Sequence, residues 1–323
     1  MFISCQHIIA KINEAGKTKT PFLFAVNYEM SEGFFIENPL QQTHILFDIN
    51  GISNADKDSL QDKDFVFERF PESFETYEKR FNYAMDALRK GEISLLNLTI
   101  KTPIKTSLSL QEIFEHSEAK YRLYVPEKFV CFSPERFVVI KEGKIFSHPM
   151  KGTIDATLPN AAEILLNNSK ELAEHQTMAK LTCNDLERVA SNVKINRFRY
   201  IDKLKTNNGY ILQTSSEIEG TLPYDYLQNL GTLFFKLLPA GSISGSPRDA
   251  ALRVIRECEQ QTRGYYSGVV GYFDGENLDS GVLIRFIEEE NGKMYFRSGG
   301  GITADSNCKS ECLEAIQKVY LPF

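Results

Sequence analysis

The sequence is poor in several features that mark particular classes of protein. Histidine occurs five times in 323 residues and no GxSxG motif is present, which disfavours a serine–histidine hydrolase. The six cysteines form no CxxC pair, so neither a zinc site nor a disulfide framework is expected. No apolar run reaches the roughly 18 residues of a membrane span, and the first residues lack a secretory leader pattern. We therefore expect a reduced, cytoplasmic protein.

An excess of positive charge is also missing. The chain has 37 lysines and arginines against 43 aspartates and glutamates, which gives a formal net charge of −6. This balance provides no general attraction to nucleic acid or to an anionic membrane, so we expect neither as a partner. Hydrophobic residues make up 42% and charged residues 25% of the chain, a composition that allows a large globular core.

Residue patterns favour an α+β fold. Helical periodicity is clearest in four segments, which are Phe74–Lys90, Ala161–Asn192, Asp249–Cys258 and Ser310–Val319. Short runs rich in aromatic and β-branched residues predict strands at Phe22–Tyr28, His44–Asp48, Phe129–Phe132, Phe137–Ile140, Tyr210–Leu212, Gly268–Phe273, Gly281–Phe286 and Met294–Arg297. The polar stretches Asn50–Lys63 and Lys205–Gly209 are expected to be surface loops. The order of these segments predicts a single domain over residues 1–323, with two packed, mostly antiparallel β-sheets and helices outside.

Four glutamates form two pairs with helical spacing. Glu171 and Glu174 lie three residues apart in the long predicted helix, and Glu311 and Glu314 repeat that spacing in the last one. Residues three apart project from one face of a helix. If the two faces met across a cleft, their carboxylates would repel one another unless a cation were bound, and Mg²⁺ prefers such oxygen ligands. The alternative is that both pairs are solvated surface, as glutamates on helices usually are.

Two glycine-containing segments are able to present backbone amides to a ligand. Gly241–Arg248 (GSISGSPR) directly precedes a predicted helix, where N–H groups can bind an anion, although its spacing is neither that of a P-loop nor GxGxxG. Ser298–Ile302 (SGGGI) follows a predicted strand and allows a ligand to approach the backbone closely. The alternatives are a tight turn for the first segment and a bulge for the second.

Two cationic residues stand in unusual surroundings. Arg285 interrupts an otherwise apolar strand-like run, so its charge must meet an anion, either a structural carboxylate or a substrate. Lys151 stands between Pro149 and Gly152 in the constrained segment HPMKGT, where a lysine could act as a nucleophile. The alternative for Lys151 is an ordinary surface lysine.

Taken in order along the chain, these segments resemble the chorismate-utilising enzymes, a family that includes anthranilate, aminodeoxychorismate, isochorismate and salicylate synthases. The matching segments run from about residue 75 to the C-terminus and leave residues 1–74 as a shortened N-terminal region; they are Ser133–Val138 (SPERFV), His148–Ile154 (HPMKGTI), Lys170–Ala190, Leu237–Arg248, Arg263–Tyr272, Leu283–Phe286 (LIRF) and Gly299–Glu314. The resemblance implies a two-sheet α+β sandwich with the active site in the cleft between its halves.

The resemblance assigns roles to the acidic residues. Glu174 and Glu314 match family positions that hold Mg²⁺, and this ion binds the ring carboxylate of chorismate. Glu171 and Glu311 would then be supporting carboxylates. Glu135 matches a general acid or base close to the C4 hydroxyl that leaves the substrate ring.

The substrate-binding positions follow in the same way. Arg285, Tyr266 and the backbone at Gly299 and Gly301 match positions that hold the carboxylates of chorismate. Three further positions in the matching segments are implied to bind the substrate, and these are Ser242, Gly152 and Thr153. On this interpretation, the anion that Arg285 meets is the substrate.

Lys151 resembles the residue that distinguishes aminodeoxychorismate synthases, which typically have a P-I-K-G-T pattern where anthranilate and isochorismate synthases have alanine. The implied function is Mg²⁺-dependent amination of chorismate at C4 through a lysine adduct at C2, giving 4-amino-4-deoxychorismate for p-aminobenzoate and folate synthesis. Leu95 is a second indication of amination, because isochorismate and salicylate synthases have a water-activating lysine at the matching position. The alternatives are an anthranilate synthase component I and a catalytically silent homologue that binds chorismate.

Two positions depart from the family pattern. Gln213 stands where the family has a histidine, and Arg248 stands where it usually has a lysine, which keeps the charge but changes its geometry. No segment resembles a glutamine amidotransferase. Besides chorismate, the expected partner is therefore free ammonia or a separate glutamine amidotransferase subunit.

Overall fold

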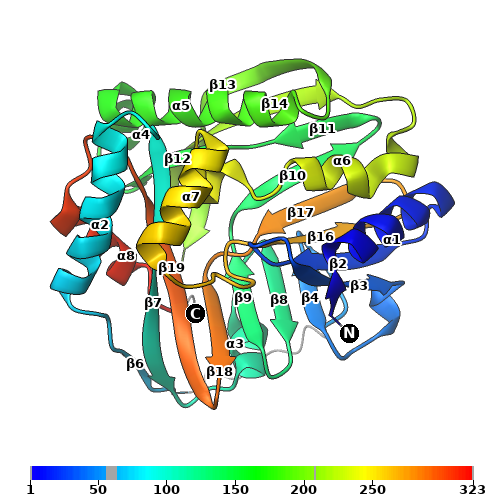
Figure 1. The fold of residues 1–323 in the computed structure, drawn as a ribbon, viewed down its shortest axis with the longest axis horizontal. Coiled ribbons are helices and arrows are strands. Elements are labelled where there is room, and N and C mark those ends of the chain that lie inside the picture. Colours follow the sequence, from blue (N-terminus) through cyan, green and yellow to red (C-terminus); the bar gives the residue numbers. More distant parts are fainter. Residues whose placement is uncertain (1, 56–63, 207–208, 322–323) are drawn as a thin grey trace.

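The structure is a computed structural model that describes residues 2–55, 64–206 and 209–321. Within these ranges the chain forms two large antiparallel β-sheets with helices packed around them (Figure 1). This arrangement confirms the predicted α+β class and the prediction of two sheets. Each sheet draws its strands from separate parts of the chain, so the chain passes from one sheet to the other several times.

The strands of the first sheet are β1 (Ile3–Ser4), β2 (Phe22–Val26), β3 (Glu32–Glu37), β10 (Arg136–Lys141), β11 (Lys144–Ser147), β12 (Met150–Asp155), β13 (Ser191–Thr206), β14 (Gly209–Thr221), β16 (Val269–Phe273) and β17 (Leu278–Val282). Their order is β1-β3-β2-β16-β17-β10-β11-β14-β12, with β13 paired to β14. The strands of the second sheet are β4 (Leu46–Ile49), β5 (Ile52–Ser53), β6 (Phe67–Arg69), β7 (Leu95–Thr106), β8 (Tyr121–Val125), β9 (Phe129–Ser133), β15 (Gly245–Ser246), β18 (Phe286–Glu290) and β19 (Lys293–Ile302). Their order is β15-β7-β19-β18-β9-β8-β4-β5, with β6 paired to β7.

The helices of the described ranges are α1 (Cys5–Thr18), α2 (Phe74–Arg89), α3 (Leu110–His116), α4 (Ala161–Asn167), α5 (Ser169–Leu186), α6 (Leu230–Lys236), α7 (Arg248–Glu259) and α8 (Cys308–Gln317). Three short 3₁₀ helices are η1 (Pro39–Gln41), η2 (Tyr226–Asn229) and η3 (Gly241–Ile243). Helix α5 packs on β12, β13 and β14 of the first sheet, whereas α2, α7 and α8 pack on β7 and β19 of the second (Figure 1).

Apolar residues explain why these elements form and where they pack. All five residues of β2 are buried, since this strand lies between β3 and β16. The rings of Phe22 and Phe273 lie 5.0 Å apart across β2 and β16. In α1, Ile8, Ile12 and Ala15 recur at helical spacing and form the buried face that meets α6. Each fully buried isoleucine side chain contributes on the order of 1.5–3 kcal/mol.

Two crossings between the sheets lie side by side. The segment Pro134–Glu135 connects β9 of the second sheet to β10 of the first, and residues 283–285 connect β17 of the first to β18 of the second. The crossings are hydrogen-bonded to each other, because Val282 N donates to Glu135 O and Phe132 N donates to Arg285 O, each at 3.0 Å. The backbone therefore fixes Glu135 and Arg285 at the junction of the two sheets.

The structure differs from the sequence predictions at three places. The predicted helix Ala161–Asn192 is two helices, because Asn168 ends α4 and its side chain caps the start of α5, and the last part of the segment begins β13. The predicted strand Gly281–Phe286 is interrupted, since Arg285 has a φ of 53°. Of the two expected loops, residues 56–63 and 207–208 lie outside the described residues, and the flanks of the second loop belong to β13 and β14.

Candidate active site

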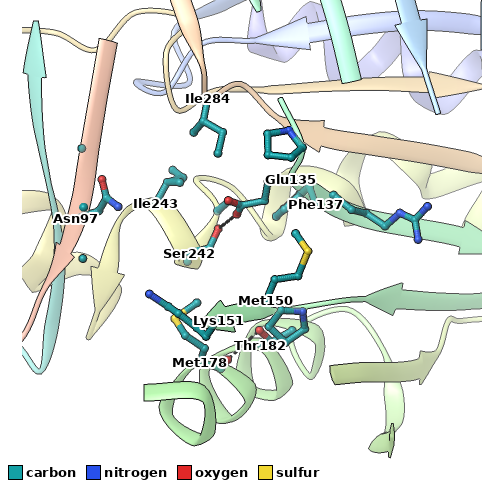
Figure 2. A pocket seen from close by; sticks show the side chains of 18 of the residues that line it. Asn97, Glu135, Phe137, Met150, Lys151, Met178, Thr182, Ser242, Ile243 and Ile284 are labelled. Carbon is teal, nitrogen blue, oxygen red and sulfur yellow. Dashed lines mark hydrogen bonds between the residues drawn. The ribbon is translucent and has the colours of Figure 1, made fainter. Parts of the chain in front are cut away.

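A cavity of about 630 Å³ lies where the two sheets meet, and it is lined by residues of both sheets, α5, η3 and α8. All of the residues that the sequence assigned to a site line this cavity: Glu135, Lys151, Gly152, Thr153, Glu171, Glu174, Ser242, Tyr266, Arg285, Gly299, Gly301, Glu311 and Glu314. Figure 2 shows part of the wall, with side chains from several distant segments facing one space. Folding therefore gathers the whole predicted set.

Lys151 lies in β12, and its side chain extends into the cavity (Figure 2). The amine Nζ is 3.8 Å from the position that a Cβ on Gly301 would take, so a side chain at that position would contact the amine. The strand is irregular here, because the pairing with β14 shifts between Lys151 and Thr153. Gly152, at this irregularity, has a φ of 74°, and an added Cβ would lie 2.7 Å from Glu171 Oε2. Both backbone conformation and space thus favour glycine beside the lysine.

Glu135 faces the same cavity from the crossing between β9 and β10. The hydroxyl of Ser242 donates a hydrogen bond to Glu135 Oε1 at 2.6 Å (Figure 2). Burial raises the pKa of the Glu135 carboxyl, while the Ser242 hydrogen bond and the positive charges of Lys151 and Lys318 oppose that rise. A carboxyl with a raised pKa is suited to general acid catalysis, because it retains a proton to a higher pH.

The two acid pairs face the cavity from different helices. Glu171 and Glu174 come from α5, whereas Glu311 and Glu314 come from α8. Glu311 and Glu314 reach the same part of β19, since their oxygens lie 3.6 and 3.7 Å from the Cβ position of Gly300. The donor set is entirely carboxylate, which suits a hard cation such as Mg²⁺. Among the described residues, however, no three His, Cys, Asp or Glu side chains are arranged as a metal site.

Lys318 is a site residue that the sequence analysis did not single out. Its ammonium group pairs with Glu314 Oε1 at 2.7 Å and donates a hydrogen bond to Gly299 O at 2.8 Å. The lysine therefore places a positive charge beside the acid pair of α8 and beside the glycine-rich strand. The spacing of Lys318 four residues after Glu314 was the available signal, because such residues meet on one face of a helix.

Arg285 and Tyr266 line the cavity at the other crossing. Arg285 is not inside a strand, as the sequence had suggested: it occupies the bend between β17 and β18, and its guanidinium donates a hydrogen bond to Lys318 O at 2.9 Å and lies 5.0 Å from the Tyr320 ring. Tyr266 is buried, and burial is the main cause that raises the pKa of its hydroxyl to about 12. Tyr266 is therefore a neutral hydrogen-bonding group at physiological pH.

A buried ion pair is hydrogen-bonded to the backbone of two residues in the cavity wall. Arg263 and Glu259 have side-chain exposures of 1% and 0%, and Arg263 Nη2 donates to Glu259 Oε1 at 2.7 Å. Arg263 also donates hydrogen bonds to Asn97 O in β7 and to Ile243 O in η3. Asn97 and Ile243 both line the cavity, so this ion pair fixes two parts of its wall relative to each other.

The positions that depart from the family pattern also lie at or near the cavity. Gln213 lines it and pairs in register with Thr153 across β14 and β12. Arg248 instead forms an ion pair with Asp185 of α5 and donates a hydrogen bond to Leu238 O.

His175 on α5 is a fully buried histidine. Burial is the main cause that lowers its pKa to about 4, so its ring is neutral. The ring forms a hydrogen bond with Ser216 Oγ at 2.6 Å.

None of the helices in the part of the chain that the structure describes is both long and apolar enough to cross a membrane.

Comparison with known proteins identifies the family. The family model described as "chorismate binding enzyme" matches residues 15–322. An "Uncharacterized PabA-like protein" of Haemophilus influenzae is 46% identical over 319 residues, which cover 98% of this chain and 97% of that protein. Anthranilate synthase component 1 of Arthrobacter globiformis is 34% identical over 65% of this chain and 39% of its own length. Aminodeoxychorismate synthase component 1 of Bacillus subtilis is 29% identical over 75% of this chain and 54% of its own length.

The fold agrees with this assignment. The solved structure of MenF, the menaquinone-specific isochorismate synthase from Escherichia coli, superposes with a TM-score of 0.73 at 15% identity, covering 98% of this chain and 82% of that one. The family model extends over nearly all of the chain and includes every residue that lines the cavity. This protein belongs to the chorismate binding enzyme family.

Proposed function

We propose that this protein is an aminodeoxychorismate synthase component I, which aminates chorismate at C4 to give 4-amino-4-deoxychorismate. The observation that carries the proposal is Lys151, whose amine enters the cavity beside Gly301. A lysine in this place supplies a nucleophile, and Glu135 on the same cavity supplies an acid. The product is a precursor of p-aminobenzoate in folate synthesis.

The reaction takes two displacements. The neutral amine of Lys151 forms a bond to C2 of chorismate and becomes a secondary ammonium, both ring double bonds shift by one position toward C4, and the C4–O bond breaks. Glu135 donates its proton to the departing hydroxyl, which leaves as water. Ammonia then forms a bond to C4, both double bonds return to their original positions and the C2–N bond breaks, which releases Lys151 as a neutral amine. The carboxylate of Glu135 takes a proton from the new ammonium group and is ready for another turnover.

We propose that Mg²⁺ is held by Glu174 and Glu314, with Glu171 and Glu311 as supporting carboxylates. This proposal is supported by the cavity, which the two acid pairs line from α5 and α8, and by the all-oxygen donor set. The ion would neutralise the ring carboxylate of the substrate. We assign the second carboxylate of chorismate to Arg285 and Tyr266, with Gly152, Thr153 and the backbone of Gly299 and Gly301 as further substrate contacts.

The ammonia is proposed to come from free ammonium or from a separate glutamine amidotransferase subunit. The cysteines of the chain support an outside source. Burial raises the pKa of the Cys5 thiol to about 11 and that of Cys258 to about 12. The pKa of each of the other four cysteine thiols is also raised, with burial as the main cause. A glutaminase needs a nucleophilic thiolate, and a raised pKa disfavours that form.

Anthranilate synthesis is the second candidate, since one relative with 34% identity carries that name. Both reactions consume chorismate and ammonia, so the product decides between them. The purified protein is incubated with chorismate, Mg²⁺ and ammonium salt, and the product is identified by chromatography and mass spectrometry. We expect aminodeoxychorismate, which an added lyase converts to p-aminobenzoate.

Two variants test the lysine. Lys151→Ala should lose amination while still binding chorismate, and Lys141→Ala, whose side chain is exposed at the end of β10, should retain the wild-type rate. A wild-type rate in Lys151→Ala would refute the covalent step. Anthranilate as the product would refute the proposed reaction, and chorismate binding without any product, even with a glutaminase subunit added, would leave a silent binding protein.

A further inference from the structure

We infer that Ser242 is a positioning residue, which holds the Glu135 carboxyl at the cavity wall and is itself held by the Asp185–Arg248 ion pair. The inference deepens the proposed function and rests on it for the role of Glu135 as the acid. The contacts among Ser242, Glu135 and Asp185 do not depend on that role.

The first step is the contact between Ser242 and Glu135. The hydroxyl and Oε1 are 2.6 Å apart, at the short end of the range for O–H···O hydrogen bonds (Figure 2). The two residues come from different parts of the chain, since Glu135 lies at the sheet crossing and Ser242 in the middle of η3. The hydrogen bond therefore fixes the carboxyl relative to a second, separate element.

The second step is that side chains on both sides hold η3 in place. Asp185 of α5 lies against Gly241, where an added Cβ would be 2.6 Å from Asp185 Oδ2. The Asp185 carboxylate is held by Arg248, which also donates to Leu238 O on the segment that leads into η3. On the other side, Arg263 donates to Ile243 O at 2.8 Å. A turn fixed at both ends gives the Ser242 hydroxyl a fixed position.

The third step is the set of charges that face Glu135. Lys151 approaches from β12 and Lys318 from the end of α8, and both favour the ionised carboxylate. Arg285 lines the same cavity from the neighbouring crossing, and the acid pairs line it from α5 and α8. In Ser242→Ala these charges remain while one donor to the carboxylate disappears, so the ionised form loses stabilisation and Glu135 should keep its proton to a higher pH.

The test compares Ser242→Ala with Ser242→Thr, which keeps the hydroxyl. The ionisation of Glu135 is followed by infrared difference spectroscopy between about pH 4 and 9, with the carboxyl band assigned by its absence in Glu135→Gln. We expect Ser242→Ala to raise the midpoint by about one pH unit, as hydrogen bonds to charged groups of ordinary strength predict. Ser242→Thr should stay near the wild-type midpoint. Equal midpoints in wild type and Ser242→Ala would overturn the inference, as would a Glu135 carboxyl that does not titrate in this range.

A second variant tests the contact between Asp185 and Gly241. Gly241→Ala brings a Cβ against Asp185 and should also raise the Glu135 midpoint, by less than Ser242→Ala; no shift would show that Asp185 does not position Ser242. The spectroscopy needs no turnover, so it separates this inference from the proposed function. With an active enzyme, the upper pH limit of kcat should move upward in Ser242→Ala, because the protonated form of Glu135 is the acid. A merely structural role of Ser242 would lower kcat without moving that limit.

Discussion

Gly152 offers a prediction that separates backbone strain from a change at the site. Its φ is 74°, and an added Cβ would lie 2.7 Å from Glu171 Oε2 and 3.1 Å from Glu171 Cδ. Gly143, in the turn between β10 and β11, has nearly the same φ of 73°, but an added Cβ there meets nothing within 4 Å. The pair Gly152→Ala and Gly143→Ala therefore shares the backbone strain and differs in the contacts of the added Cβ, which at Gly152 are with Glu171 and, at 3.2 Å, with Leu165 Cδ1.

The magnitudes follow from these two facts. A left-handed φ costs an alanine roughly 1–2 kcal/mol, and this cost is common to both variants. The unfolding entropy of a 323-residue chain is about 0.7 kcal/mol per kelvin, so this strain should lower the melting temperature of Gly143→Ala by about 1.5–3 °C and that of Gly152→Ala by at least as much. Only Gly152→Ala must also displace the Glu171 carboxylate. Loss of a supporting group beside a metal typically weakens metal affinity by about 10- to 100-fold, and we expect that loss in Gly152→Ala alone.

The assay is calorimetric melting, followed by titration of the reaction rate with Mg²⁺ at saturating chorismate and ammonium. Gly143→Ala should have the Mg²⁺ dependence of the wild type, and Gly152→Ala should need at least about tenfold more Mg²⁺ for half-maximal rate. Identical Mg²⁺ dependence in the two variants would refute the reasoning that Glu171 supports the metal. A melting temperature of Gly143→Ala equal to that of wild type would refute the estimate of the backbone strain.

Glu259→Gln should destabilise the protein by about 3–5 kcal/mol, because it leaves the buried Arg263 charge without its partner, and chemical denaturation measures this loss. The exposed control Glu257→Gln should cost less than about 0.5 kcal/mol, and equal losses would contradict the argument. Glu174→Gln and Glu314→Gln should each abolish Mg²⁺-dependent turnover, and an unaffected rate would remove that residue from the metal site. Leu95→Lys, which places an amine near Lys151, should divert part of the product to isochorismate. Chromatography would detect this product, and the absence of an isochorismate peak would show that position 95 does not select between ammonia and water as the nucleophile.

Local sequence was sufficient for most of the elements, and the resemblance assigned a set of residues that line one cavity in the structure. Runs such as Phe22–Val26 are short, apolar and rich in aromatic residues, which favours a buried strand, and the faces of α7 and α8 follow from helical spacing. The sequence also predicted the residues that could carry chemistry, since Lys151 and the acid pairs stand out by residue type and spacing. These signals are local, and neighbouring residues determine them.

Only the tertiary structure decided how these residues meet. Arg285 was predicted inside a strand, yet it occupies the crossing between β17 and β18, because the connection between two sheets needs a bend that no local pattern specifies. The contact of Ser242 with Glu135 joins residues 107 positions apart, and the position of Lys318 beside Gly299 depends on the packing of α8 on β19. The sequence by itself determined which groups are available and which elements carry them. Their distances, burial and pKa shifts were decided by the packing of two sheets around one cavity, because these quantities depend on neighbours that are remote along the chain.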